Sequence, residues 1–290
     1  MVKKIKTTKA KEPKIKKLPG IIGLIKLALR PIKLNRNLFL GFILLQFGLN
    51  IIFVIGVDSI YDFPSIKQDA QENLEGSAAS YNQSFALLNY VLAIGSNGAN
   101  SSYQFFIILI SSLAVIWAIR QVLAKQKITL KQSFYEGVYP LVPFFLVFLV
   151  IGLQLIPLLA GNFLLATVIA NNLAVSALEQ IFWWAVFILL ALVSLYMVVS
   201  SIFALYIATL PDMTPLKALK SARGLVRGRR FSIGVRLLIL PILTLLLYII
   251  VLIPLINFLP ILVVPIFALL GGFALFFVHS YIYNLYRELL

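Results

Sequence analysis

Long apolar runs alternate with short charged segments along this chain. Six of the runs reach the roughly 20 residues that a helix needs to cross the hydrocarbon core of a bilayer. They lie at about 38–57, 103–123, 140–160, 181–207, 233–256 and 261–285. The pattern therefore predicts an all-α polytopic membrane protein, with six transmembrane helices in a membrane domain over residues 37–286.

Two further apolar stretches fall short of the length or hydropathy of a span. One is "FALLNYVLAIG" at 85–95, within the outer loop predicted at 58–102, and the other is "GNFLLATVIANNLAVSALEQ" at 161–180. By length, each is predicted to be an interfacial or re-entrant helix rather than a seventh span. A soluble segment is the remaining alternative for both.

Charged residues are divided unevenly between the two sides that six spans define. The outer segments hold one basic and six acidic residues, whereas the inner segments hold 24 basic and four acidic residues. An excess of Lys and Arg marks the cytoplasmic side of a membrane protein. We therefore expect both termini in the cytoplasm, with the protein in the bacterial cytoplasmic membrane.

The N-terminal segment "MVKKIKTTKAKEPKIKK" contains eight lysines within residues 1–17. It has almost no core-forming pattern and is predicted to be a disordered cytoplasmic tail. The first apolar run begins only near Leu38 and lacks a small-residue cleavage site. We therefore expect that run to be an uncleaved anchor.

Cytoplasmic stretches before the first, third and fifth spans have apolar and polar residues on opposite helical faces. In the first stretch, 18–36, Pro31 is expected to kink or divide the helix, and the second, 128–140, is shorter and less basic. The basic face of the first consists of Lys26, Arg30 and Lys33. Three repeated units of surface helix and hairpin would explain this recurrence, and so would the common basic character of cytoplasmic loops.

The third stretch, 212–231, carries the strongest helix signals. Thr214 and Pro215 form a favourable N-cap and first-turn pair, and Gly228 is a suitable terminator. Its basic residues are Lys217, Lys220, Arg223, Arg227, Arg229 and Arg230. They are the candidate site for anionic lipid headgroups or a protein partner, and the alternative is that they only orient the fifth span.

Composition excludes several kinds of chemistry. The chain is 61% hydrophobic with a mean hydropathy of +0.99, and it contains no cysteine and one histidine. Disulfides, thiol nucleophiles and cysteine zinc sites are therefore excluded, and we expect no metal, cofactor or enzymatic activity. The net charge of +15 does not indicate a nucleic-acid partner, because the basic residues gather beside the apolar runs.

Polar side chains within the spans offer few candidates for chemistry. Arg120, Arg236 and His279 lie toward the cytoplasmic ends, where arginine extends to the interface and histidine suits an interfacial belt. The uncharged candidates are Gln46, Asn50, Ser111, Ser112, Gln154, Ser194, Ser200, Ser201 and Thr244. Such groups commonly form hydrogen bonds between helices.

The block from Asp212 to Phe231 contains "PLKALKSARGLVRGRRF" directly before a long span. It resembles the cytoplasmic helix of the membrane-domain family of glycerophosphodiester phosphodiesterases and of related uncharacterised six-span bacterial membrane proteins. The motif covers about thirty residues, and the six-span layout extends the likeness loosely to 20–285. The resemblance implies that catalysis in the phosphodiesterases belongs to a separate metal-binding barrel domain, and we expect no such domain within this chain. The resemblance therefore implies a membrane domain without its enzyme.

The same block, followed by "LLILP" at 237–241, is also similar to the coupling helix of ABC-importer permeases, although the Glu-Ala-Ala signature is missing. Two hypotheses follow. The first is a non-enzymatic membrane protein that binds membrane phospholipids, preferentially anionic, or scaffolds a membrane partner. The alternative is a transporter, or a permease subunit coupled to a partner ATPase through residues 212–231.

Overall fold

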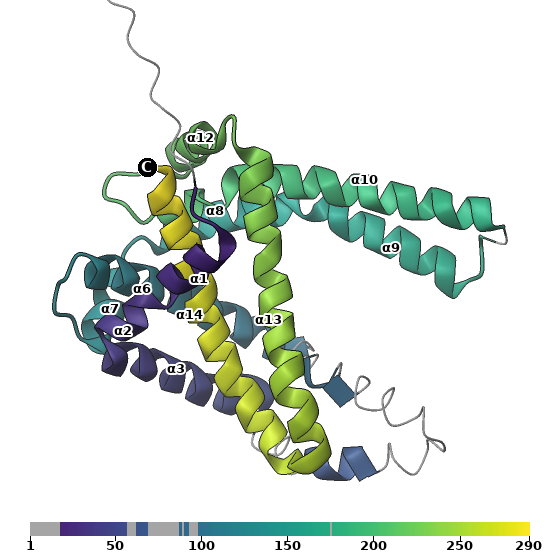
Figure 1. The fold of residues 1–290 in the computed structure, drawn as a ribbon, viewed down its shortest axis with the longest axis horizontal. Coiled ribbons are helices and arrows are strands. Elements are labelled where there is room, and N and C mark those ends of the chain that lie inside the picture. Colours follow the sequence, from purple (N-terminus) through teal and green to yellow (C-terminus); the bar gives the residue numbers. More distant parts are fainter. Residues whose placement is uncertain (1–17, 57–61, 69–86, 89, 93–97, 175) are drawn as a thin grey trace, which may run out of the picture.

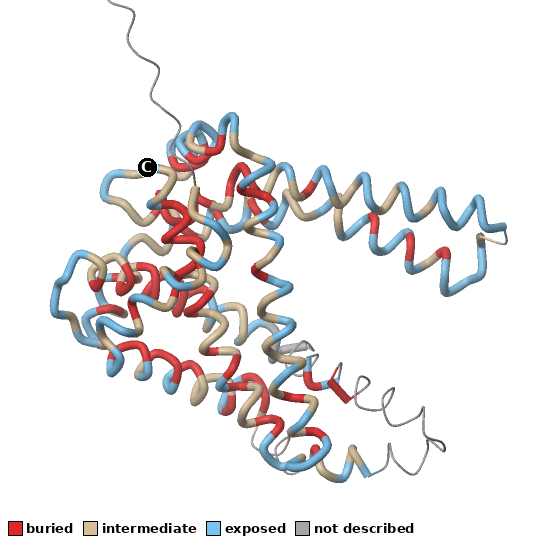
Figure 2. The backbone as a smooth tube through the Cα atoms, in the orientation of Figure 1, coloured by how far each residue is buried: buried red, intermediate tan, exposed pale blue. Residues whose placement is uncertain are grey.

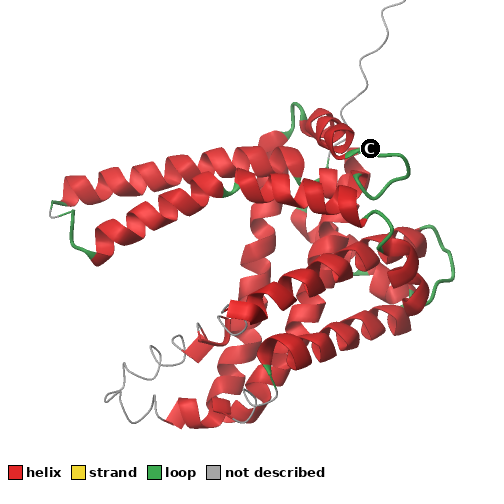
Figure 3. Cartoon of the chain, turned by 180° about the vertical axis from the view of Figure 1, so that it is seen from behind, coloured by secondary structure: helices red, strands yellow, loops and turns green. Residues whose placement is uncertain are grey.

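Helices make up nearly all of the chain that the structure describes. The computed structural model describes residues 18–56, 62–68, 87–88, 90–92, 98–174 and 176–290. Within these ranges there is no strand (Figure 3), and six helices are long and apolar enough to cross a membrane. The predicted tail at 1–17 and most of the predicted outer loop, including much of 85–95, lie outside the described residues.

The first pair of spans agrees with the hydropathy pattern. Its elements are α3 (Arg36–Asn50), the π-helix η1 (Ile51–Ile55) and α6 (Gly98–Leu123). Asn35 caps α3 by accepting a hydrogen bond from the Leu38 amide at 3.3 Å, which satisfies one of the free donors at the helix start. Gly56 then ends η1 with a φ of 82°, a conformation open to glycine.

The second pair of spans is a long hairpin with an interruption. Its elements are α8 (Leu141–Gln154), α9 (Ile156–Ala170), α10 (Ala177–Ser201) and α11 (Ala204–Ile207). Pro157 lies in the first turn of α9 and has no amide hydrogen to continue the α8 ladder, so the helix breaks at Leu155 and resumes. Ser176 and Glu179 form a capping box at the start of α10.

The prediction of a separate interfacial or re-entrant helix at 161–180 is wrong for residues 161–170, which continue α9. Gly161 does not stop the helix, and it packs closely on Leu190 of α10. The helix ends instead at Asn171 and Asn172, and Asn172 has a φ of 49°. Asparagine tolerates this left-handed conformation better than most residues do.

The third pair of spans is a hairpin whose two long α-helices are continuous. Its elements are α13 (Arg230–Phe258), the short 3-10 helix η2 (Pro260–Leu262) and α14 (Val263–Leu289). Pro241 and Pro254 lie inside α13 without ending it. Near the first proline, the Thr244 hydroxyl donates to the carbonyls of Leu240 and Pro241 at 3.1 and 2.9 Å.

Short helices precede the first, third and fifth spans. They are α1 (Ile21–Ala28), α2 (Arg30–Leu34), α7 (Leu130–Gly137) and α12 (Pro215–Val226). Pro31 lies in the first turn of α2 and divides the first stretch into two helices. The threefold repeat of a surface helix and a hairpin stays a prediction.

α14 is the central packing surface, and the helices α1, α3, α6 and α13 all pack on it. Figure 2 shows buried positions along much of its length. The approach of α3 is close because residue 272 is glycine. A Cβ atom there would lie 3.0 Å from the Ile43 carbonyl oxygen and 3.3 Å from Gln46 Cβ. Small residues at such contacts allow two helix backbones to approach each other.

The α9–α10 hairpin projects away from this centre (Figure 1), and most of its residues are exposed (Figure 2). The two helices pack on each other, and α10 also contacts α8, α12 and α13 near its C-terminal end. The exposed side chains include Leu159, Phe163, Ile181, Phe182, Ile188 and Leu192. A surface of this composition is suited to contact with lipid chains.

We predict that Gly272→Ala destabilises the protein by about 1–3 kcal/mol, because the added methyl group forces the α3 and α14 backbones apart. The midpoint of thermal unfolding in mild detergent, followed by circular dichroism, measures this. Gly271→Ala is the matched control, since its Cβ would meet only the Tyr248 hydroxyl at 3.9 Å. Equal midpoints for the two variants would contradict the close-approach explanation.

Candidate functional site

The helix α12 is attached to the bundle by its apolar face. The Thr214 hydroxyl accepts a hydrogen bond from the Lys217 amide at 3.4 Å, and Gly228 follows the helix with a φ of 80°. The predicted cap and terminator are therefore confirmed. The helix packs on α8, α10 and α11. Its buried side chains are Ala218, Leu219, Ala222 and Val226.

The six cations predicted as the candidate site fall into two groups. Exposed residues on α12 or directly after it are Lys217, Lys220, Arg223 and Arg227. Arg229 and Arg230 are partly buried at the start of α13. The structure records no ion pair between these cations and any other residue that it describes. Their positive charge is therefore not neutralised by carboxylates within the described part of the chain.

Arg230 differs from the other five because it packs against α10. Its guanidinium carbon lies 4.5 Å from the centre of the Tyr196 ring, a cation–π geometry, and its Nη1 donates to the Tyr196 hydroxyl. Its Nε is buried without a hydrogen-bond partner. Arg230 was predicted together with the surface cations, but its guanidinium packs on the Tyr196 side chain of α10.

The basic residues of the first cytoplasmic stretch, Lys26, Arg30 and Lys33, are exposed. The opposite, apolar face of α1 lies against protein, because Leu24 and Ala28 are fully buried. The hydroxyl of Ser280 donates to the Ala28 carbonyl at 2.6 Å, and the Asn284 amide donates to the Leu27 carbonyl at 3.3 Å. α1 is therefore attached to the C-terminal part of α14.

The two basic helices are connected through α11. Tyr206 of α11 packs on Tyr283 and Tyr286 of α14, with ring centres 6.1 and 6.5 Å away. Since α12 packs on α11 and α1 packs on α14, both basic surfaces belong to the end of the bundle where α14 terminates (Figure 1). The structure does not join them into one continuous site.

A group of polar side chains fixes the end of the fourth span. Arg120 donates to the carbonyl oxygens of Tyr206 and Thr209 at 3.3 and 3.0 Å, and also to the Thr209 hydroxyl. The Tyr206 hydroxyl lies 3.0 Å from Nδ1 of His279. Both side chains are therefore hydrogen-bonded within the protein, and the expectation that Arg120 and His279 lie at a membrane interface stays a prediction.

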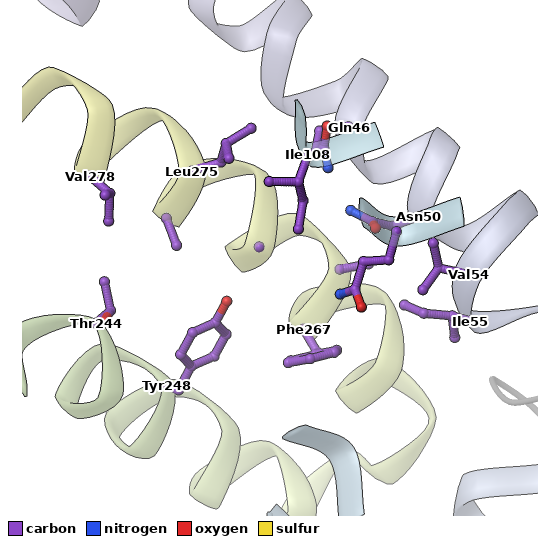
Figure 4. Close-up of a pocket in the computed structure, with 14 residues that line it drawn as sticks. Gln46, Asn50, Val54, Ile55, Ile108, Thr244, Tyr248, Phe267, Leu275 and Val278 are labelled. Carbon is purple, nitrogen blue, oxygen red and sulfur yellow. The ribbon is translucent and has the colours of Figure 1, made fainter. Parts of the chain in front are cut away.

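A cavity of about 350 Å³ lies between α3, α6, α13 and α14, and its lining is mostly apolar with several polar side chains (Figure 4). Its apolar walls include Phe267, Leu275 and Val278 of α14, and Figure 4 shows the Tyr248 ring projecting into it from α13. Its polar lining side chains are Gln46, Asn50, Gln104, Thr244 and Tyr248. No charged residue contributes to the lining.

Two local features leave space for this cavity. Small residues on α14, Ala268, Gly271 and Ala274, line one wall. On the opposite side, the Gln46 carboxamide is turned toward α6, where its oxygen accepts a hydrogen bond from the Ser111 hydroxyl at 2.8 Å. The cavity therefore offers neutral hydrogen-bonding groups and suits a neutral polar molecule or water, not an ion.

The sequence identified only part of this lining. Gln46, Asn50 and Thr244 were among the polar candidates, but Gln104 and Tyr248 were not. The available signal was helical spacing, because Gln104 precedes Ser111 by seven residues and therefore shares a face of α6 with it. Among the described residues, no group of three or more His, Cys, Asp or Glu side chains lies close enough together to hold a metal ion.

Comparisons with known proteins add no functional information: no family model, no curated protein and no solved structure matches this chain. The fold, with six long apolar helices, is compatible with a multi-pass membrane protein. The resemblance to the membrane domain of the phosphodiesterase family stays a prediction.

We predict that a cysteine at position 244 reacts with a small hydrophilic thiol reagent roughly tenfold or more faster than one at position 245. Thr244 lines the cavity of Figure 4, whereas Leu245 is exposed on the outer surface of α13. The reactive thiolate forms in water and not in hydrocarbon. Labelling rates of Thr244→Cys and Leu245→Cys in reconstituted vesicles measure this, and the chain has no other cysteine. Equal rates would mean that the cavity holds no water.

Proposed function

We propose that this chain is a non-enzymatic integral membrane protein of the bacterial cytoplasmic membrane that binds anionic phospholipids through the basic surface of α12. The exposed cations of α1 and α2 form a second, separate basic surface at the same end of the bundle. One observation carries the proposal: the apolar face of α12 is buried in protein, while Lys217, Lys220, Arg223 and Arg227 remain exposed and without ion pairs among the described residues.

This arrangement determines the kind of lipid contact. A free amphipathic helix binds a membrane by burying its apolar face among the acyl chains. In α12 most of that face is occupied by contacts with α8, α10 and α11, and apart from Leu216 the exposed surface offers mainly charge to lipid. Each Lys or Arg near an anionic surface contributes about 1 kcal/mol, and ionic strength weakens the attraction. Lipid binding should therefore be selective for anionic headgroups and sensitive to salt.

The same surface also suits a protein partner with an acidic face, which is the scaffold form of the proposal. An ATPase subunit that docked on residues 212–231 would have to meet the basic face of α12, since its apolar face is already buried. An acidic docking surface on that partner is therefore a requirement of the permease alternative.

We predict that replacing Lys217, Lys220 and Arg227 together with glutamine lowers the preference for anionic lipid severalfold. Electron paramagnetic resonance of spin-labelled phosphatidylglycerol and phosphatidylcholine, with the protein reconstituted in vesicles, gives the relative association constants. The preference of the unmodified protein should also fall as salt is raised. An unchanged preference in the triple variant would remove the basis for the proposal.

The matched control is the triple variant Lys125→Gln, Lys127→Gln and Lys131→Gln. These three lysines are exposed; Lys125 and Lys127 lie on the connection between α6 and α7, and Lys131 lies in the first turn of α7. Their replacement changes the net charge by the same amount. We expect this control to retain most of the anionic preference. An equal loss in both variants would indicate a general charge effect and not a surface formed by α12.

The proposed orientation predicts which single cysteines react in intact cells. Tyr135 is 82% exposed on α7, and Leu173 is 62% exposed at the tip of the α9–α10 hairpin. A membrane-impermeant maleimide should label Leu173→Cys in intact cells and label Tyr135→Cys only after permeabilisation. Labelling of Tyr135→Cys from outside would reverse the proposed topology.

A second candidate function is the binding or transport of a small neutral solute. It is favoured by the uncharged polar side chains that line the cavity of Figure 4. Its carboxamide and hydroxyl groups can form hydrogen bonds with such a solute. A solute that occupies the cavity should slow labelling of Thr244→Cys and leave Leu245→Cys unaffected. This pair of variants therefore provides a screen for candidate solutes.

A further inference from the structure

A second polar cavity lies where the interrupted third span meets α10, α12 and the start of α13. It encloses about 220 Å³. Its polar lining residues are Gln154, Tyr196, Ser200, Ser201, Arg223 and Arg230. No carboxylate contributes to the lining, so its two arginines give the cavity a positive charge.

The interruption at Leu155 accounts for the polar character of this junction. Because Pro157 cannot continue the helix, the Leu158 amide donates to the Ser194 hydroxyl on α10 at 2.9 Å instead. Gln154, the last residue of α8, donates through its side-chain Nε2 to the Ser201 hydroxyl at 2.9 Å. The proline thus leaves a glutamine at a helix end, facing two serines and an arginine.

Two buried polar atoms in this cavity have no partner. They are Oε1 of Gln154 and Nε of Arg230, and they are the two side-chain atoms of this kind that the described part of the chain contains. Nearly all buried polar groups in proteins are hydrogen-bonded, so each exception calls for an explanation such as a ligand or water. Because both exceptions belong to residues that line a single cavity, we infer that the cavity binds a ligand.

The chemistry of the two atoms specifies that occupant. Gln154 Oε1 is an acceptor and requires a hydroxyl or amine donor, whereas Arg230 Nε is a charged donor and requires an acceptor, best an anionic oxygen. Arg223 supplies a second positive charge. The cavity is also several times larger than the roughly 30 Å³ of one water molecule. A phosphate diester that carries a free hydroxyl satisfies both atoms.

The surroundings favour a lipid as the source of this phosphate. Leu153 and Ile156 at the interruption are more than half exposed, and so is Leu192 one turn before Tyr196 on α10. Apolar surface beside a positively charged cavity suits acyl chains attached to an anionic headgroup. A soluble phosphate would make no use of that surface.

We propose that this cavity binds the headgroup of an anionic phospholipid with a free hydroxyl, of the phosphatidylglycerol type. Arg223 and Arg230 bind the phosphate, and Gln154 accepts a hydrogen bond from the headgroup hydroxyl. The inference rests on the proposed lipid-binding function and deepens it, since it adds one saturable site to the diffuse attraction of the basic surface.

The test uses native mass spectrometry of the purified full chain, delipidated in mild detergent and titrated with single lipids. We expect one phosphatidylglycerol molecule to bind saturably. Phosphatidylmethanol, which is anionic but has no headgroup hydroxyl, should bind roughly tenfold or more weakly, and phosphatidylcholine weaker still. Equal binding of phosphatidylglycerol and phosphatidylmethanol would overturn the role of Gln154.

Two variants test the site without changing the net charge. Gln154→Leu removes the acceptor, and Arg230→Lys retains the charge but loses the planar guanidinium and its Nε donor. Each should weaken phosphatidylglycerol binding roughly tenfold or more. Gln126→Leu, at an exposed glutamine after α6, is the matched control and should bind as the unmodified protein does. Circular dichroism verifies that each variant is folded.

The outcomes separate this inference from the proposed function. If Gln154→Leu and Arg230→Lys both bind normally while the triple variant of α12 loses its anionic preference, the cavity site is overturned and the basic surface stands. If Gln154→Leu and Arg230→Lys both bind weakly while the triple variant of α12 keeps its anionic preference, the cavity site is supported and the basic surface is overturned. The lipid assignment would be overturned if soluble glycerol phosphate bound the cavity as tightly as the lipid does. It would also be overturned if the delipidated protein bound no phosphatidylglycerol in the titration.

Discussion

The close approach of α3 to α14 is the contact on which the remaining structure depends. Apolar burial adds little to association between helices in lipid, so packing of small residues and interhelical hydrogen bonds must hold the bundle together. Gly272 provides the close packing of a small residue, since a Cβ atom there would lie 3.0 Å from the Ile43 carbonyl oxygen. Ser280, further along α14, provides an interhelical hydrogen bond by its bond to α1. α1 packs directly on this span, whereas α12 is connected to it through α11.

A proline lies within one turn of a polar lining residue in each of the two cavities. Pro157 breaks the third span and leaves Gln154 at a helix end, where it lines the smaller cavity. Pro241 lies one turn before Thr244, whose hydroxyl lines the larger one. A proline removes a backbone donor, and polar side chains nearby then find partners outside the regular helix ladder.

Hydropathy predicted the six long helices, and the Thr214–Pro215 pair predicted the cap of α12, because both features depend on local sequence. It did not predict that α9 continues through 161–170, since weak hydropathy is compatible with a helix packed on a neighbour. It also did not separate Arg230 from the surface cations, or bring Gln104 and Tyr248 into the larger cavity. Those facts depend on which helix lies opposite, and a single sequence does not record such pairings.

The bond between Ser280 and the Ala28 carbonyl joins residues 252 positions apart, and it has a consequence for biosynthesis. α1 leaves the ribosome early, yet its binding surface on α14 is made near the end of translation. At about 5–20 residues per second, the helix waits on the order of tens of seconds with Leu24 and Ala28 uncovered. Throughout that interval the apolar face of α1 must contact a surface other than α14, and the adjacent membrane surface can provide it. Folding of the N-terminal region is thus a late event, completed only when the final span has been inserted.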